Sequence, residues 1–94
     1  MPHPTNAVLV GKKKTASYVM AALRMFTHEG LEEVVVKARG VNVYKAVEVA
    51  NRVAGTLESV KVERVKVYSE RLRDKNGAER RVSCIEVSLK KRGY

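Results

Sequence analysis

The chain has 94 residues and carries 19 Lys and Arg against 10 Asp and Glu, which gives a formal net charge of +9. A chain of this length has room for one hydrophobic core and is too short for two domains. Hydrophobic residues make up 45% of the sequence and are spread along it, which excludes a disordered basic tail. We therefore expect one folded, basic domain over residues 1–94 that has an anionic partner.

The cysteine count excludes further classes of protein. Cys84 is the single cysteine, so it cannot close an intrachain disulfide, and with His3 and His28 it cannot complete an ordinary structural zinc site. No apolar run approaches the ~20 residues that span a bilayer, and the first residues lack a secretory or transit pattern. We expect a cytoplasmic protein without a metal or other cofactor.

The first part of the chain predicts a β-α-β unit. An apolar run over 7–10 predicts a buried strand. Thr15 is a candidate N-cap for a helix over about 15–28, which Gly30 would end. A second buried strand follows over about 31–36. A connection of this length predicts that the two strands are parallel neighbours.

The second part predicts one helix and a hairpin. Apolar residues at helical spacing over 43–57 predict a helix with small residues on its buried stripe. Two alternating segments follow, over about 60–67 and 82–89, and each contains a phase slip. A β-bulge near Glu63-Arg64 accounts for the first slip. Asn76-Gly77 between the segments is a strong hairpin signal.

The predicted element order is therefore β-α-β-α-β-β, a two-layer α/β sandwich with both helices on one face of a mixed sheet. The hairpin is too long for a tight turn and holds few core candidates, so we expect residues of about 68–81 to project into solvent as an arm. Five cations on this arm oppose three anions. The cations are Arg71, Arg73, Lys75, Arg80 and Arg81.

Two further groups of cations lie where the predicted helices begin. Lys12, Lys13 and Lys14 precede the first helix, and the basic stretch that contains Arg39 precedes Asn42 at the start of the second. Parallel strands end at the same edge of a sheet, so we expect both groups to face one way. Free backbone N–H groups and the helix dipoles also favour anions there. Together with the arm, these groups predict an extended cationic surface for nucleic-acid phosphates.

Each group also has a less specific interpretation. The lysine run would only aid solubility, Arg39 would pair with a nearby Glu, and charge on the hairpin would protect the sheet from edge-to-edge aggregation. Tyr18 and Tyr44 are candidates for stacking on sugars or bases, or residues at the edge of the core. With so few aromatic residues, backbone recognition is favoured over base recognition, and affinity should fall steeply with salt.

Catalysis is not indicated by the sequence. Neither His3 nor His28 has a Cys, Ser or carboxylate at a spacing that suggests a triad. The segment that begins at Gly11 lacks the first glycine of the nucleotide phosphate-loop pattern, because Asn6 stands in its place. A small enzyme that acts on anionic metabolites would need a His or carboxylate convergent with the basic loops, and the sequence shows none.

Three segments carry a specific pattern: VLVGKKK at 8–14, YVMAAL at 18–23 and VVVKARGVNVYKAVEVAN at 34–51. Followed by the basic hairpin, they resemble the Alba family of small archaeal chromatin proteins over about residues 6–91. The resemblance implies a fold like the C-terminal domain of bacterial translation initiation factor three. It also implies sequence-nonspecific binding of double-stranded DNA and of RNA, compaction of the chromosome, and a homodimer, or a heterodimer with a paralogue, with two extended arms.

The resemblance also assigns roles by position. Lys12 and Lys13 match the paired central lysines of the family, and Lys12 matches the lysine that relatives acetylate, which implies a protein deacetylase as a partner. Acetylation would remove one charge and weaken binding. Arg39 matches the basic residue after the second strand, Lys45 a basic position in the second helix, and 71–81 the arm. We expect these residues, together with Asn42 at the start of the second helix, to contact the nucleic acid.

Three positions depart from the family pattern. Lys14 replaces a common proline, Val41 stands where relatives often have a second arginine, and Leu57 replaces a phenylalanine that some members use between dimers. The first adds charge, the second removes a contact, and the third puts filament-like packing in doubt. The alternative function on the same scaffold is an RNA-binding protein or a subunit of a ribonuclease P-type ribonucleoprotein.

Overall fold

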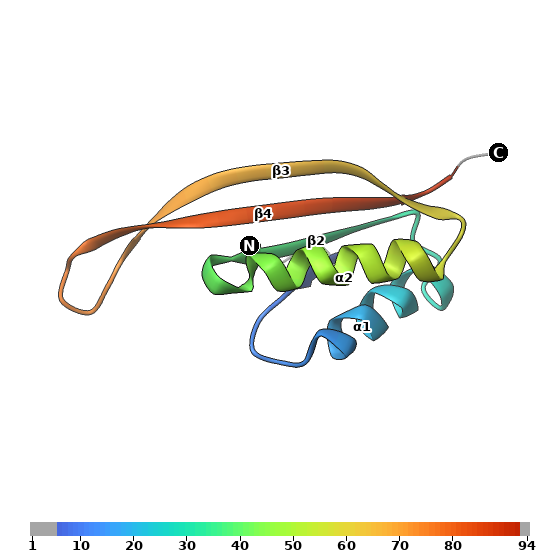
Figure 1. Cartoon of the computed structure of the whole chain (residues 1–94), viewed down its shortest axis with the longest axis horizontal. Coiled ribbons are helices and arrows are strands. Elements are labelled where there is room, and N and C mark those ends of the chain that lie inside the picture. The colour runs from blue at the N-terminus through green and yellow to red at the C-terminus, as the bar shows by residue number, and fades with distance from the viewer. Residues whose placement is uncertain (1–5, 93–94) are drawn as a thin grey trace.

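The computed structural model describes residues 6–92 and shows a four-stranded sheet with two helices on one face (Figure 1). The predicted order β-α-β-α-β-β is confirmed, with one short 3₁₀ helix added before the second α-helix. His3 lies outside the described residues. The elements are β1 (Ala7–Leu9), α1 (Thr15–Thr27), β2 (Glu33–Arg39), the 3₁₀ helix (Gly40–Asn42), α2 (Val43–Thr56), β3 (Val60–Arg73) and β4 (Glu79–Lys91).

The sheet is mixed and has the strand order β1-β2-β4-β3. β1 pairs with β2 in parallel, as the β-α-β pattern predicted, and β4 is antiparallel to both β2 and β3. β4 therefore lies inside the sheet, while β3, which follows α2 directly, forms an edge. Within residues 6–92, no helix has the length and hydrophobicity needed to cross a bilayer.

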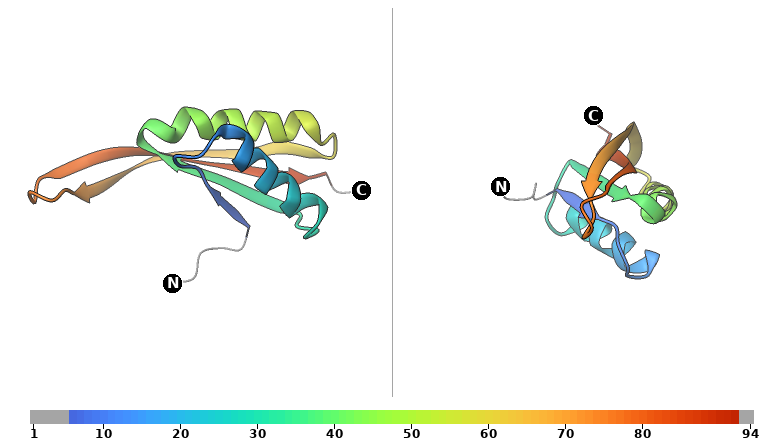
Figure 2. Two further views of the ribbon diagram at one scale, coloured as in Figure 1. Left: turned by 90° about the horizontal axis from the view of Figure 1, so that it is seen from below. Right: turned by 90° about the vertical axis from the view of Figure 1, so that its left-hand side faces the viewer.

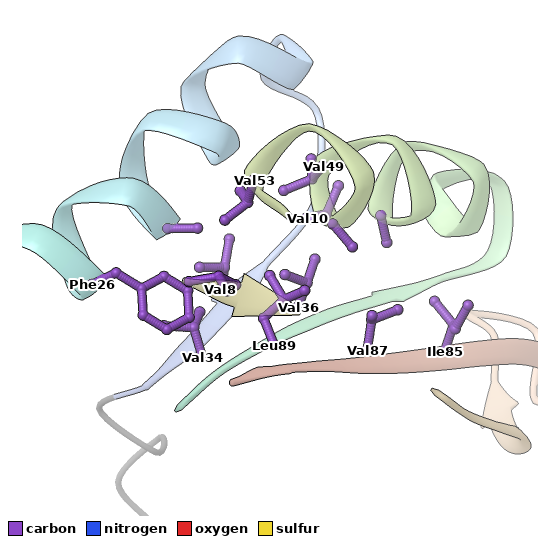
Figure 3. Close-up of a cluster of buried hydrophobic side chains, with 14 residues drawn as sticks. Val8, Val10, Phe26, Val34, Val36, Val49, Val53, Ile85, Val87 and Leu89 are labelled. Atoms are coloured by element: carbon purple, nitrogen blue, oxygen red, sulfur yellow. The ribbon is translucent and has the colours of Figure 1, made fainter. Parts of the chain in front are cut away.

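The core lies between the sheet and the helices (Figure 3). Alternate residues of β1, β2 and β4 point toward the helices because side chains of a strand alternate between its two faces. The buried residues of α2 follow helical spacing, as predicted. Val49 is buried among them, whereas Val47 lies beside them and is 37% exposed. The main contributors are Val8, Val10, Phe26, Val34, Val36, Ala46, Val49, Ala50, Val53, Ile85, Val87 and Leu89.

The start of α1 differs from the prediction. Lys14, not Thr15, occupies the N-cap position, with extended backbone (φ −63°, ψ 148°) and no side-chain capping bond. The carbonyl oxygen of Lys14 accepts a hydrogen bond from the N–H of Ser17 at 3.0 Å, which makes Thr15 the first helical residue. The predicted end is confirmed, since Gly30 follows the helix with a φ of 68° that favours glycine.

One of the two predicted phase slips is a β-bulge. The pairing of β3 with β4 shifts between Val62 and Arg64, so the predicted bulge near Glu63-Arg64 is confirmed. In β4 the pairing runs without a shift. Val82 and Ile85 are instead on opposite faces of the sheet because they are three positions apart on a regular strand. The second slip therefore marks two apolar sets on one strand, not a distortion.

β3 and β4 continue beyond the body of the molecule as a two-stranded arm (Figures 1 and 2). Their pairing extends to Arg73 opposite Glu79, so both strands are longer than the alternation of valines predicted. The Asp74 carboxylate closes the tip by accepting hydrogen bonds from the N–H groups of Asn76 and Ala78, both at 2.9 Å. The molecule measures 50 × 24 × 22 Å, with the arm along its longest axis.

Candidate nucleic-acid interface

The starts of both helices lie toward the end of the molecule from which the arm extends (Figure 1 and the left view of Figure 2). They also make direct contact. The Lys45 Nζ, from the first turn of α2, donates hydrogen bonds to the carbonyl oxygens of Gly11 (2.7 Å) and Lys13 (2.9 Å) in the loop before α1. The structure thus brings together the two helix starts that the sequence placed at one edge of the sheet.

Lys12, Lys13 and Lys14 are exposed in this loop. Within residues 6–92 the ion pairs join Arg52 to Glu48, Arg73 to Glu79 and Lys90 to Glu63. None of these involves the three loop lysines, so in the described part of the chain their charges are not neutralised by a carboxylate. The loop presents three positive charges to solvent.

The two tyrosines proposed for stacking lie in different surroundings. Tyr18 is half-buried, and its hydroxyl oxygen accepts hydrogen bonds from the N–H groups of Gly11 (2.9 Å) and Lys13 (3.0 Å). The Lys45 Nζ lies 6.0 Å from the centre of the Tyr18 ring. Tyr44 is 72% exposed at the start of α2, which leaves its ring available to a partner.

The basic stretch after the second strand is placed differently from the prediction. Lys37 and Arg39 belong to β2 itself, and the connection to α2 is the 3₁₀ helix. Arg39 is exposed and takes part in no ion pair with the described residues. Asn42 precedes α2 as predicted, but its side chain makes no capping bond. Beside them Val41 is 96% exposed, an apolar side chain within a cationic surface.

The arm carries its arginines on both sides. Arg71 lies opposite Arg81 and Arg73 opposite Glu79, and by strand alternation these four share one side of the ribbon. Arg73 Nη2 is 3.7 Å from Glu79 Oε1. Arg80, opposite Leu72, lies on the other side, and Lys75 lies in the turn at the tip. The predicted basic arm thus presents cations around its circumference.

The face of the sheet opposite the helices holds polar contacts that the sequence did not reveal. The Tyr68 hydroxyl donates a 2.7 Å hydrogen bond to Glu86, and this bond, followed by burial, raises the pKa of Tyr68 to about 12. The Cys84 thiol donates to Glu70 at 3.1 Å, and burial raises the pKa of this thiol. Tyr68, Glu70 and Cys84, together with Arg39, line a depression of about 400 Å³. Strand alternation was the available signal, since Tyr68 and Glu70 are two positions apart.

No group of three or more His, Cys, Asp or Glu side chains within residues 6–92 is arranged to hold a metal ion. Cations instead predominate over anions at the helix starts and along the arm. They lie in the three-lysine loop, at the end of β2, at the start of α2 and on the arm.

The family model described as Alba matches residues 6–69. This chain belongs to the Alba family. The match covers both helices, β1, β2 and most of β3, and the resemblance expected from the sequence is confirmed. The Alba fold is also confirmed by comparison with solved structures. Alba from Thermoplasma volcanium superposes with a TM-score of 0.84 at 33% identity, over 92% of this chain and 100% of that one.

Two curated Alba relatives cover nearly the whole chain. The protein of Nanoarchaeum equitans is 43% identical over 88 residues, which is 90% of this chain and 97% of the relative. The protein of Methanocella arvoryzae is 38% identical over 87 residues, which is 92% of this chain and 90% of the relative. Both are named DNA/RNA-binding protein Alba.

Proposed function

We propose that this Alba-family chain is a binding protein, not an enzyme, that coats double-stranded DNA without sequence preference and also binds RNA. The observation that carries the proposal is the loop of Lys12, Lys13 and Lys14, exposed, without carboxylate partners among the described residues, and fixed beside the start of α2. The relatives are named DNA/RNA-binding proteins, which supports the proposal. In this proposal the whole chain acts as one binding domain with residues of about 68–81 as its arm.

The chemistry of binding is neutralisation of backbone phosphates. Lysine and arginine contacts release counterions from the nucleic acid, so log K falls by about 0.9 per phosphate contact for each decade of salt on duplex DNA. Phosphate contacts position a protein on a duplex but do not specify sequence. The proposed phosphate-binding cations are Lys12, Lys13, Lys14, Arg39, Arg71, Arg73, Lys75, Arg80 and Arg81, with Asn42 as a polar neighbour.

A homodimer is part of this proposal, and an exposed row of valines supports it. Val62, Val65 and Val67 are 38%, 53% and 71% exposed on the edge strand β3. They lie opposite Leu89, Val87 and Ile85, so they share the face of the sheet that the helices cover. A row of apolar side chains beside an unpaired strand edge is typical of an interface. Ile85, Val87 and Leu89 do not belong to this exposed row, because they are buried in the core.

A dimer would place two arms and two lysine loops on one duplex, which supports chromosome coating and compaction. A paralogous chain with a matching apolar row would form the same interface. Leu57, at the end of α2, is half-buried and packs against the core of its own chain, which leaves only part of its side chain for a contact between dimers.

Lys12 is the proposed acetylation site. It is exposed and has no ion pair with the described residues, so its amine is open to a modifying enzyme and to a deacetylase. Acetylation would remove one positive charge from the loop and lower affinity and the salt slope together.

The second candidate function is that of an RNA-binding protein or a subunit of a ribonuclease P-type ribonucleoprotein. The names of the relatives, which include RNA binding, favour this candidate. Competition between duplex DNA and structured RNA for the purified protein at one salt concentration distinguishes the candidates. The proposed function predicts that duplex DNA displaces the RNA at comparable concentration. Binding of RNA that a large excess of duplex DNA fails to displace would favour the ribonucleoprotein role and overturn the leading one.

A further inference from the structure

The backbone of the lysine loop is held by two side chains from outside it. The Tyr18 hydroxyl oxygen accepts hydrogen bonds from the N–H groups of Gly11 and Lys13, and the Lys45 Nζ donates hydrogen bonds to the carbonyl oxygens of the same two residues. The four distances lie between 2.7 and 3.0 Å. We call Tyr18 and Lys45 together the loop clamp.

Gly11 fits the clamp closely. A Cβ atom built at this position would lie 3.4 Å from the Tyr18 hydroxyl oxygen, which is van der Waals contact. The Tyr18 hydroxyl thus lies directly against the backbone at Gly11.

The loop clamp leaves Lys45 little capacity for a phosphate. An ammonium group has three N–H donors, and two of them are occupied by the carbonyl oxygens of Gly11 and Lys13. The group also lies near the Tyr18 ring, where the π-face favours a cation. A phosphate contact by Lys45 would require these internal bonds to break. The family resemblance implies that Lys45 contacts the nucleic acid, whereas in the structure its ammonium group points to the loop backbone.

We propose that Tyr18 and Lys45 are positioning residues, which fix the backbone at Gly11 and Lys13 so that the loop lysines meet the phosphate backbone already ordered. The inference rests on the proposed function. Ordering three adjacent like charges in advance removes an entropic cost from binding, because the loop no longer has to be immobilised by the nucleic acid. Lys45 contributes through the loop and makes no phosphate contact of its own.

The first test uses Tyr18→Phe, which keeps the ring and changes no charge. The N–H groups of Gly11 and Lys13 lose their acceptor, so their hydrogen exchange in the free protein should become faster. Affinity for a duplex DNA of fixed length should fall about threefold to tenfold, the range expected for loss of one or two hydrogen bonds. Unchanged exchange at both amides, or unchanged affinity, would overturn the proposal.

The second test separates positioning from direct contact. In a Lys12→Ala/Lys13→Ala background the loop has lost most of its charge, so Tyr18→Phe should have less than a third of its effect on affinity. A full effect in this background would show that Tyr18 acts on the nucleic acid directly and would overturn the positioning role.

The third test addresses Lys45 through the salt dependence of binding. The control is Lys61→Met, which removes an exposed lysine from the start of β3, at the far end of the molecule from the arm (Figure 1). In the Lys12→Ala/Lys13→Ala background, the variants Lys45→Met and Lys61→Met should have the same salt slope of DNA binding. A slope lower by about 0.9 relative to that control would mean that Lys45 contacts a phosphate, and would overturn the inward role.

Failure of the proposed function would look different from failure of the clamp. If the chain did not bind nucleic acid, the unsubstituted protein would show no salt-dependent affinity for DNA or RNA, and the positioning role would fall with the function. The hydrogen exchange of Gly11 and Lys13 needs no nucleic acid, so slower exchange in the unsubstituted protein than in Tyr18→Phe would still establish the clamp as a structural feature.

Discussion

Arg71 and Arg73 form a matched pair for testing the arm. They lie two positions apart on β3 and share one side of the ribbon, but Arg71 faces Arg81 across the strands while Arg73 faces Glu79. Replacing either with Gln removes the same single charge. Arg71→Gln removes a like-charge neighbour, whereas Arg73→Gln removes the ion pair in which Nη2 lies 3.7 Å from the Glu79 Oε1.

The magnitudes follow from exposure. The side chains of Arg73 and Glu79 are 71% and 57% exposed, so their attraction is that of a surface pair, about 0.2–1 kcal/mol. Like charges directly opposite each other on two strands destabilise by a similar amount, about 0.2–1 kcal/mol. With about 0.5 kcal/mol for each, Arg71→Gln stabilises the arm, Arg73→Gln destabilises it, and the two variants differ by about 1 kcal/mol. Both variants should lower the salt slope of DNA binding by about 0.9.

The assays are hydrogen exchange of the arm amides at low salt, where screening is weak, and duplex binding over a range of salt. About 1 kcal/mol corresponds to roughly a fivefold difference in exchange rate between the variants. Arm stability that changes in the same direction in both variants would refute the cross-strand electrostatics. Salt slopes that both equal that of the unsubstituted protein would remove the arm from the phosphate-binding surface.

Three further predictions address other parts of the molecule. Lys12→Ala with Lys13→Ala should lower the salt slope by about 1.8 per chain, and by about twice that when both loops of a dimer contact one duplex; a slope that does not change removes the loop from the interface. Val65→Lys should convert a dimer to a monomer in sedimentation, and sedimentation as a 10.5 kDa monomer before any substitution would contradict the dimer. The pKa of Tyr68 is raised to about 12 by its hydrogen bond to Glu86, above the ordinary value of about 10, so its contribution to stability is complete below pH 10 and is lost as pH rises toward 12. The difference between the ultraviolet titrations of the unsubstituted protein and of Tyr68→Phe reports Tyr68 alone; it should be centred toward pH 12, and a difference centred near pH 10 would refute the assignment.

Periodicity predicted the elements because each one has an apolar face. The parity change at Glu63-Arg64 predicted the bulge for the same reason, since only an extra residue restores the alternation on β3. Periodicity does not state which strand a helix covers. Because α2 lies over the inner strands, Val87 is buried, whereas Val65 directly opposite it on the edge strand is exposed. The sequence pattern of the two residues is alike, and only the strand order separates them.

The charged residues of the candidate site were predictable from the sequence, but the hydrogen bonds that hold the lysine loop were not. Runs of lysine and arginine at the helix starts are visible in the sequence, and the turn signal at Asn76-Gly77 together with the few core candidates around it predicts the arm. The hydrogen bonds from Lys45 to the loop join residues 32 and 34 positions apart. No local sequence pattern indicates that a lysine, which is usually exposed, donates hydrogen bonds to the backbone of its own chain. The same holds for Tyr18. Helical spacing predicts where its ring lies on α1, but the hydrogen bonds of its hydroxyl depend on the path of the loop before the helix.

The measurement that tests the account most directly is the affinity of the purified protein for two duplexes of equal length and unrelated sequence, each titrated over a range of salt. Binding through backbone phosphates predicts equal affinities and equal, steep linear falls of log K with the logarithm of salt concentration. Affinities that differ by more than about tenfold between the duplexes, the cost of one mismatched base pair for a sequence-specific protein, or that hardly change with salt, would contradict it.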